Sequence, residues 1–302
     1  MYCGRISVLR ILTGPLKNTI GATADLEGHK EMKTRIISAA VLVPFLFVVV
    51  LALDEIVAAL IMAAMMAVGA YELLFRTRLV RHPRLVIYSC IMAAFLSMWS
   101  YFGAVQAWLL LAVLIYLVLL FVEMMMDHVK VHFETLAVCF FAGFLVPYLL
   151  TSLIRILMLG VGRYVIMIPF VVAFVSDGGA YFAGYFLGKH KLAPVVSPNK
   201  TIEGAVGGLL ADVLGMILYG LILDLGFHFE VNYLIAIFYG LIGSAAGVFG
   251  DLMFSVIKRQ TGIKDYGNLI PGHGGVLDRF DSMTVVAPLV ELLMLYIPMV
   301  VK

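Results

Sequence analysis

The feature that most constrains this chain is a series of long apolar runs that contain almost no charged side chains. Residues 36–53 and 85–122 carry no charge at all, and each of six further runs is interrupted by at most one acid. A helix that crosses a membrane needs about 20 consecutive, mostly apolar residues. Within lipid, its backbone polar groups must be satisfied inside the segment. The chain is therefore predicted to be an all-α, polytopic integral membrane helical bundle.

Composition supports this fold class and excludes several others. Of the 302 residues, 63% are hydrophobic and 13% are charged, whereas soluble domains carry about 25% charged residues. A disordered chain would need far more polar residues. The apolar runs are continuous, whereas the strands of a membrane barrel alternate apolar and polar residues. The net charge of +2 provides no field that would attract a polyanion, so no nucleic-acid partner is expected.

Nine transmembrane helices are expected from the lengths of the runs. The run 85–122 is too long for one span and is predicted to hinge near Tyr101, Phe102 and Gly103. The other predicted spans cover residues 36–53, 56–75, 135–154, 164–188, 204–223, 231–257 and 282–301.

The distribution of lysine and arginine over the loops predicts the orientation. Positively charged loops remain in the cytoplasm, and most Lys and Arg residues fall on the same side as Lys33 and Arg35. This places the N-terminus in the cytoplasm, the C-terminus on the opposite side, and every polar motif at the cytoplasmic face. Nothing in the chain looks like an organelle-targeting segment, which favours a bacterial inner membrane.

The chain divides into three regions that differ in composition. Residues 1–31 are polar and mixed, and are expected to be a disordered extension or a mis-assigned start ahead of Met32. Residues 32–163 are N-terminal membrane helices with little chemistry. Residues 164–302 hold most of the glycines, the intramembrane acids and two polar cytoplasmic loops, so they are expected to carry the function.

The richest constellation lies at the end of the eighth predicted span. On one helix Asp251, Ser255, Lys258 and Arg259 follow each other at i, i+4, i+7 and i+8, which places them on one face. An acid at the edge of the hydrocarbon with cations beside it suits a polyanion chelated to a divalent metal. The alternative is that Asp251 pairs with Lys258 or Arg259 and merely closes the bundle.

Two further acids stand at the mouth of the last predicted span. Asp278 and Asp281 are three residues apart and would share a helix face, and His273-Gly274-Gly275 before them allows a ligand to approach the backbone closely. Carboxylates suit Mg²⁺, so Asp251, Asp278 and Asp281 are the candidate metal ligands.

Two more motifs are candidates for nucleotide contacts. Residues 197–204 open the seventh predicted span and read either as an ordinary helix cap or as an anion cradle in which Lys200 meets phosphate. Asp177, inside the sixth predicted span, is either a metal or nucleotide contact or a hydrogen-bond partner of a neighbouring helix. Asp212 and Glu291 are expected to be packing or cavity residues.

Together these residues resemble the signature of the phosphatidate cytidylyltransferases, also called CDP-diacylglycerol synthases. The resemblance is carried by Ser255, Lys258-Arg259, Lys264-Asp265, Pro271, His273-Gly274-Gly275 and Asp278-Arg279-Phe280-Asp281. Residues 197–204 are similar to the family's second conserved run and residues 177–188 to its third. Gly178 and Tyr185 depart from that third run, where a hydroxyl and a basic residue are expected.

The resemblance implies that CTP and phosphatidate give CDP-diacylglycerol and pyrophosphate, with Mg²⁺ and, as an open alternative, a monovalent cation such as K⁺ nearby. It implies a metal on Asp251 and Asp278, and cations that neutralise phosphates. The remaining candidates are the catalytic set Ser255, Lys258, Arg259, His273 and Arg279 and the nucleotide contacts Asp177, Ser197, Asn199, Lys200, Thr201, Glu203 and Lys264.

Two rival functions are weighed against this reading. A CTP-dependent polyprenol or phytol kinase would share the nucleotide contacts but transfer the γ-phosphoryl group. A cation transporter would use Asp177, Asp212 and Asp251 as an ion path, but the clustering of acids beside Lys and Arg argues against it. Whether the protein forms a homodimer is left open.

Overall fold

The computed structural model describes residues 44–103, 105–272 and 274–301. The predicted extension 1–31, the first part of the first predicted span (36–43) and His273 lie outside the described residues.

The first half is a row of apolar helices. It contains η1 (Val48–Ala52), α3 (Glu55–Tyr71), η2 (Glu72–Arg76), α4 (Pro83–Phe102), α5 (Gln106–Met126), α6 (Phe133–Phe140), η3 (Phe141–Leu145), α7 (Val146–Leu150) and α8 (Ser152–Leu157), the η segments being π-helical turns. The predicted hinge is confirmed, because α4 ends at Phe102 and Gly103 follows with a φ of +55°. Glycine adopts this left-handed conformation at little cost and ends helices for that reason.

The second half combines long helices with two small antiparallel strand pairs. It contains α9 (Gly162–Val165), α10 (Met167–Leu187), β1 (Lys191–Ala193), β2 (Ser197–Thr201), α11 (Ile202–Phe227), β3 (Glu230–Val231), α12 (Tyr233–Gln260), α13 (Leu277–Phe280), α14 (Met283–Tyr296) and β4 (Val300–Val301). Strand β1 pairs with β2, and β3 pairs with β4.

Seven helical segments among the described residues are long and apolar enough to cross a membrane, so the count of nine is not confirmed. The predicted span 282–301 is wrong as a single helix. Helix α14 has 14 residues, about 21 Å at 1.5 Å per residue, and it ends at Tyr296. Pro298 has no N–H to continue a helix, and the chain then pairs with β3 as strand β4.

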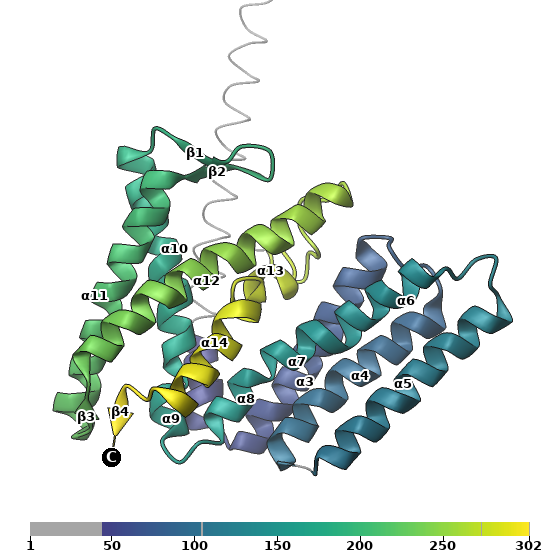
Figure 1. Ribbon diagram of the computed structural model, residues 1–302, viewed down its shortest axis with the longest axis horizontal. Coiled ribbons are helices and arrows are strands. Elements are labelled where there is room, and N and C mark those ends of the chain that lie inside the picture. Colours follow the sequence, from purple (N-terminus) through teal and green to yellow (C-terminus); the bar gives the residue numbers. More distant parts are fainter. Residues whose placement is uncertain (1–43, 104, 273, 302) are drawn as a thin grey trace, which may run out of the picture.

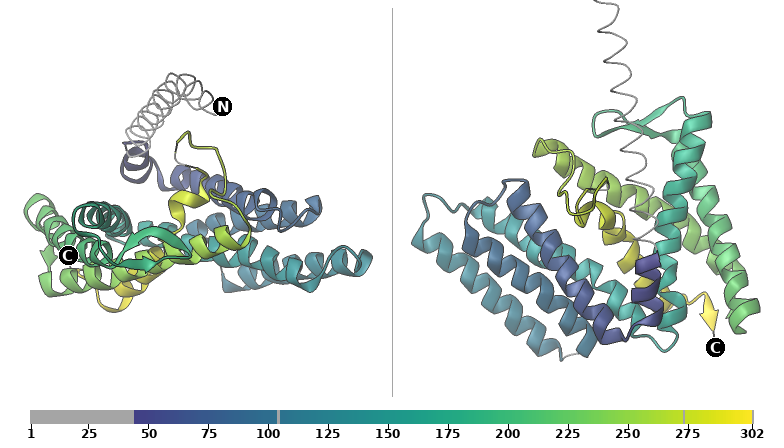
Figure 2. Two further views of the ribbon diagram at one scale, coloured as in Figure 1. Left: turned by 90° about the horizontal axis from the view of Figure 1, so that it is seen from above. Right: turned by 180° about the vertical axis from the view of Figure 1, so that it is seen from behind.

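The helices form two groups that are joined by α14. Helices α3 to α8 lie side by side, and α10, α11 and α12 form the second group (Figure 1). Figure 2 shows the same two groups from above and from behind. Helix α14 packs against α7 and α8 of the first group and against α10 and α12 of the second. A bidentate ion pair strengthens this junction, because Arg155 of α8 donates to both oxygens of Glu291 in α14 at 2.6 and 2.8 Å.

The outer surface of this bundle is apolar. Large side chains such as Leu110, Leu114 and Val118 on α5 and Leu210 and Leu214 on α11 are exposed. A soluble protein rarely exposes apolar patches of this extent, so these faces are matched to lipid. The coarse prediction of a polytopic helical membrane protein is confirmed, whereas its division into regions 1–31, 32–163 and 164–302 stays a prediction.

Small residues allow α10 and α11 to pack against each other at close range. A Cβ added at Gly179 would collide with the Cβ of Ala211, and one added at Gly207 would collide with the Cβ of Ala183. Close approach through small residues is how helices associate inside lipid, where no hydrophobic force drives them together. Helix α10 is continuous through this region, so Gly179 serves packing and does not break the helix.

Two adjacent glycines allow a matched test of this packing. Gly179→Ala should lower the free energy of unfolding by about 1–3 kcal/mol through overpacking, whereas Gly178→Ala has open space around the added Cβ and should be neutral or slightly stabilising. Thermal unfolding of both variants in detergent measures the difference. Equal stability of the two variants would contradict the packing account.

Candidate functional site

The predicted motifs gather at one end of the molecule. The β1–β2 hairpin, the C-terminal end of α12 and the loop that leads to α13 lie at the upper end of Figure 1, whereas β3, β4 and α9 lie at the opposite end. Motifs that are up to a hundred residues apart in the sequence therefore share one polar region.

The start of α11 is braced by its own motif. Thr201 caps the helix, because its Oγ1 accepts a hydrogen bond from the N–H of Gly204 at 3.1 Å. The Glu203 carboxylate accepts the backbone N–H groups of Lys189 and His190 at 3.1 Å and contacts the Nδ1 of His190 at 2.6 Å. Thr201 and Glu203 thus fix the hairpin to the helix, and their predicted nucleotide contacts stay predictions.

Lys200, in the same hairpin, reaches across to α12. Its Nζ forms an ion pair with a carboxylate oxygen of Asp251, and each side chain is about a quarter exposed. The alternative in which Asp251 pairs with Lys258 or Arg259 is wrong. Those two cations lie about two turns further along α12 and contact other partners. The cation that compensates the charge of Asp251 therefore comes from a different motif.

Asp177 links the third motif to this pair. It lies on α10 and is exposed, and the charges of Asp251, Lys200 and Arg279 all act on it. Asp212 lies deeper, fully buried in α11, and within the described part of the chain its two carboxylate oxygens have no hydrogen-bond partner.

Lys258 compensates two buried carboxylates at the other side of the site. Its Nζ lies 3.1 Å from Oδ1 of Asp278 and 3.8 Å from Oδ2 of Asp281. It also lies 5.4 Å from the centre of the Tyr266 ring. Burying a carboxylate is costly unless an opposite charge and hydrogen bonds accompany it, so these three charges depend on one another.

The loop before α13 wraps around Asp278. Oδ2 of Asp278 accepts the backbone N–H of Tyr266 at 2.8 Å and that of Gly275 at 2.9 Å. Gly274 has a φ of +84°, a conformation that favours glycine, and a Cβ there would lie 2.8 Å from the same oxygen. The glycines of this motif therefore allow the backbone to close on a carboxylate.

Asp281 lies against the glycine that precedes Asp251. A Cβ on Gly250 would come within 3.0 Å of the carbonyl oxygen of Asp281 and of Ser282 Cα, so α12 and the start of α14 approach closely here. Asp281 accepts the N–H of Ser282 at 2.8 Å. Burial, and then the negative charge of Asp251, raise the pKa of Asp281, and Lys258 opposes this shift.

The other predicted site residues are spread around this centre. Arg259 donates from Nε to the carbonyl oxygen of Val196 in the hairpin at 3.0 Å. Ser255 is buried in α12, and Ser197 is half-buried in β2. The exposed members are Asn199, Arg259, Lys264 and Arg279.

The chemistry of these side chains fits a hard divalent cation. Asp177, Asp251, Asp278 and Asp281 offer carboxylate oxygens, which Mg²⁺ prefers. Among the residues that the structure describes, no three His, Cys, Asp or Glu side chains converge on a single point as a metal site. Asp251 and Asp278 instead contact Lys200 and Lys258.

Sequence reasoning missed one residue at this site, Glu72. It lies in η2, is 3% exposed, and accepts the backbone N–H groups of Val276 and Leu277 at 3.2 and 3.0 Å. The signal in the sequence was that Glu72 is the one acid of the run 56–75 and stands near its end. That end of the run lies at the end of the molecule that carries the motifs.

The fold and the site define a polytopic membrane protein with a cluster of alternating lysines and aspartates at one end. The model of the cytidylyltransferase family matches residues 33–297, and the chain belongs to this family. The family resemblance predicted from residues 177–281 is thereby confirmed.

Proteins named phosphatidate cytidylyltransferase are similar to part of the chain. The one from Staphylococcus haemolyticus (strain JCSC1435) is 44% identical over 134 residues, which are 44% of this chain and 50% of the relative. The one from Staphylococcus saprophyticus is 43% identical over 136 residues, 45% of this chain and 51% of the relative. The chain spans about half the length of the relatives it matches.

The charge balance around Lys258 can be tested through stability. Lys258→Met should lower the free energy of unfolding by about 3 kcal/mol, because it leaves two buried carboxylates without their cation. The loss should be smaller at about pH 6 than at about pH 8, because protonation relieves a carboxyl whose pKa burial already raises.

Thermal unfolding of this variant over that pH range is the measurement, and Lys264→Met, at an exposed lysine, is the matched control. A loss no larger than that of the control, or one that grows as the pH falls, would show that Lys258 does not compensate these acids.

Proposed function

We propose that the protein is a phosphatidate cytidylyltransferase that makes CDP-diacylglycerol and pyrophosphate from CTP and phosphatidate. Membership of the cytidylyltransferase family and the names of its relatives support this reaction. One observation carries the proposal. The Lys200–Asp251 pair and the cluster of Lys258, Asp278 and Asp281 lie at the same end of the molecule.

The reaction needs positioning and charge neutralisation more than acid–base chemistry. An anionic oxygen of the phosphatidate phosphate forms a bond to the α-phosphorus of CTP, and the bond from that phosphorus to the bridging β-phosphate oxygen breaks. The electron pair leaves with pyrophosphate. A phosphate monoester is already anionic at neutral pH, so a general base is not required. The main barrier is the repulsion between two polyanions.

The ion pairs of the site suit a binding step in which the lysines exchange their carboxylate partners for phosphate groups. Mg²⁺ would be held by Asp251, Asp278 and Asp281, and it would supply positive charge that offsets the negative charge of the phosphates. Lys200 and Lys258 would then leave these carboxylates for phosphate groups. Each buried charge would keep a partner throughout, which avoids the cost of an uncompensated ion.

The exposed cations extend this surface toward the nucleotide. Arg279 follows Asp278 directly in the sequence, Lys264 stands two residues before Tyr266, and both are exposed. Arg259 joins α12 to the hairpin through Val196. Arginine and lysine at such positions would neutralise the phosphates and the leaving pyrophosphate. A monovalent cation such as K⁺ beside Mg²⁺ is part of the proposal, and a homodimer is left open.

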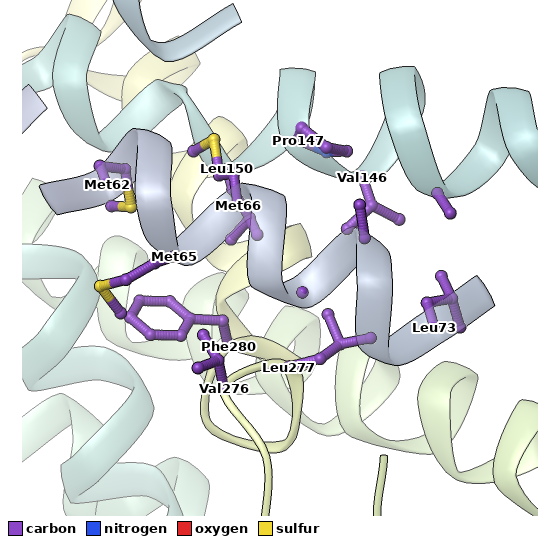
Figure 3. Close-up of a pocket in the computed structure, with 13 residues that line it drawn as sticks. Met62, Met65, Met66, Leu73, Val146, Pro147, Leu150, Val276, Leu277 and Phe280 are labelled. Atoms are coloured by element: carbon purple, nitrogen blue, oxygen red, sulfur yellow. The ribbon is translucent and has the colours of Figure 1, made fainter. Parts of the chain in front are cut away.

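An apolar pocket next to the charged cluster supports a lipid substrate. A narrow apolar crevice, with a cavity volume of about 20 Å³, lies between α3, α7 and the segment that carries Asp278. Figure 3 shows Met65 beside the ring of Phe280, with Val276 and Leu277 on the same wall. A second apolar pocket shares Met62, Met65 and Phe280. An acyl chain would have to part these side chains to enter the crevice, and its headgroup would then lie near Asp278.

We further propose that the protein lies in a bacterial inner membrane with the site facing the cytoplasm. Support comes from its bacterial relatives and from the Lys and Arg residues at the site end, which the positive-inside rule assigns to the cytoplasm. This orientation gives CTP access from the cytosol and phosphatidate access from the bilayer.

The reaction is tested with purified protein in detergent, CTP, phosphatidate and Mg²⁺. We expect CDP-lipid and pyrophosphate in equal amounts, and we expect Asp278→Asn to lower the rate by several orders of magnitude. Asp127→Asn, at an exposed Asp127–Lys130 pair, should keep wild-type turnover.

Release of CDP with a phosphorylated lipid would indicate the kinase, and absence of nucleotide turnover would favour a transporter. Full activity of Asp278→Asn would refute the metal assignment.

The acyl-chain pocket is tested by filling it. Met65→Trp should lower kcat/KM for long-chain phosphatidate by about tenfold, because the larger ring displaces part of the chain. Dihexanoyl phosphatidate, whose short chains would contact less of this crevice, should be affected much less. Leu110→Trp, on the lipid-facing side of α5, serves as the control. An equal effect of Met65→Trp on both lipids would contradict the pocket assignment.

A further inference from the structure

Glu72 is a buried carboxylate in the half of the molecule that carries no other part of the site. It belongs to η2, the π-helical turn that continues α3, and it is 3% exposed. Its Oε1 accepts the N–H of Val276 at 3.2 Å and its Oε2 accepts the N–H of Leu277 at 3.0 Å. These N–H groups open α13 and have no carbonyl of their own helix to bind, so Glu72 supplies their acceptor.

The loop that it contacts is shaped around this carboxylate. A Cβ added at Gly267 would collide with Oε1 of Glu72, and a Cβ added at Gly275 would collide with both oxygens. Two glycines from separate parts of the loop thus leave the space that the carboxylate fills. Any side chain at either position would push Glu72 away from its backbone partners.

The same turn also holds Asp278. The N–H of Gly275 donates to Asp278, and the next two N–H groups along the chain, those of Val276 and Leu277, donate to Glu72. The charge of Asp278 acts on Glu72 in turn. Three consecutive peptide groups are therefore fixed by two carboxylates, one from this loop and one from the other half of the molecule.

We propose that Glu72 is a positioning residue of the active site, which holds the turn at residues 275–277 so that Asp278 keeps its orientation. The catalytic consequence rests on the proposed function, whereas the structural consequence does not. The π-helical turn is part of this device, because such turns widen a helix locally and recur at functional sites. Glu72 also couples the N-terminal helices to a site otherwise built from the C-terminal ones.

The structural consequence is tested by hydrogen–deuterium exchange of the full chain in detergent, without nucleotide or Mg²⁺. In Glu72→Gln the side chain keeps its length, but an NH2 group replaces one of the two accepting oxygens and cannot accept an N–H. Exchange in peptides that cover residues 266–277 should become at least about tenfold faster, with little change elsewhere.

Glu123→Gln is the matched control, because Glu123 is another buried acid of the N-terminal helices. It is 6% exposed and accepts hydrogen bonds from Arg84 and Tyr88 of α4, at 3.4 and 3.1 Å. This variant should leave exchange in residues 266–277 unchanged. Unchanged exchange of that loop in Glu72→Gln, or an equal effect of both variants on it, would overturn the proposal.

The catalytic consequence is measured as CDP-lipid formation. Glu72→Gln should lower the rate by about 10–100-fold, as the loss of an outer-shell partner typically does, with the change mainly in kcat. A rate equal to that of the wild type would overturn the positioning role. If the wild-type protein makes no CDP-lipid, the proposed function fails, and the exchange experiment still decides whether Glu72 holds the loop.

A second pair of variants tests the contact itself. Gly267→Ala should loosen the same loop, because the added Cβ displaces the Glu72 carboxylate. In a Glu72→Ala background that carboxylate is absent, so Gly267→Ala should add less than about twofold to the exchange rate. Independent effects of the two substitutions would show that Gly267 does not act through Glu72.

Discussion

The mutual compensation of opposite charges at one end of the molecule is the constraint on which this site depends. Asp278 and Asp281 are buried, and Lys258 lies between them at 3.1 and 3.8 Å. Lys200 compensates the charge of Asp251 through a separate ion pair. Asp278 and Asp281 are buried, so their charges would be costly without Lys258. The end of α12, the hairpin and the start of α13 are therefore held together by the charges that we propose receive a metal and two phosphates.

The rest of the fold serves to bring these charges to one place. Close contacts at Gly179 and Gly207 set the approach of α10 and α11, and the contact at Gly250 sets that of α12 and the start of α14. At the opposite end, Arg155 and Glu291 fasten α8 to α14. The bundle is thus stabilised by small-residue contacts and a few ion pairs, which is expected where lipid removes the hydrophobic force between helices.

Much of this was predictable from local patterns in the sequence, and the rest depended on geometry between helices. The bend at Gly103 and the continuous helix through Asp251 and Lys258 follow from run length and glycine chemistry. The partner of Asp251 did not follow, because it depends on the rotation and depth of two helices. Glu72 was missed because a buried acid that binds backbone groups has no distinctive sequence neighbours. The end of α14 was missed because the apolar run continues past Pro298.

The most direct test of the account is a structure of the protein with Mg²⁺ and a non-hydrolysable CTP analogue. The account predicts that the metal contacts Asp251 and Asp278, and that Lys200 and Lys258 have moved from these carboxylates to phosphate oxygens. A nucleotide bound elsewhere, with the Lys200–Asp251 and Lys258–Asp278 pairs both intact, would contradict it.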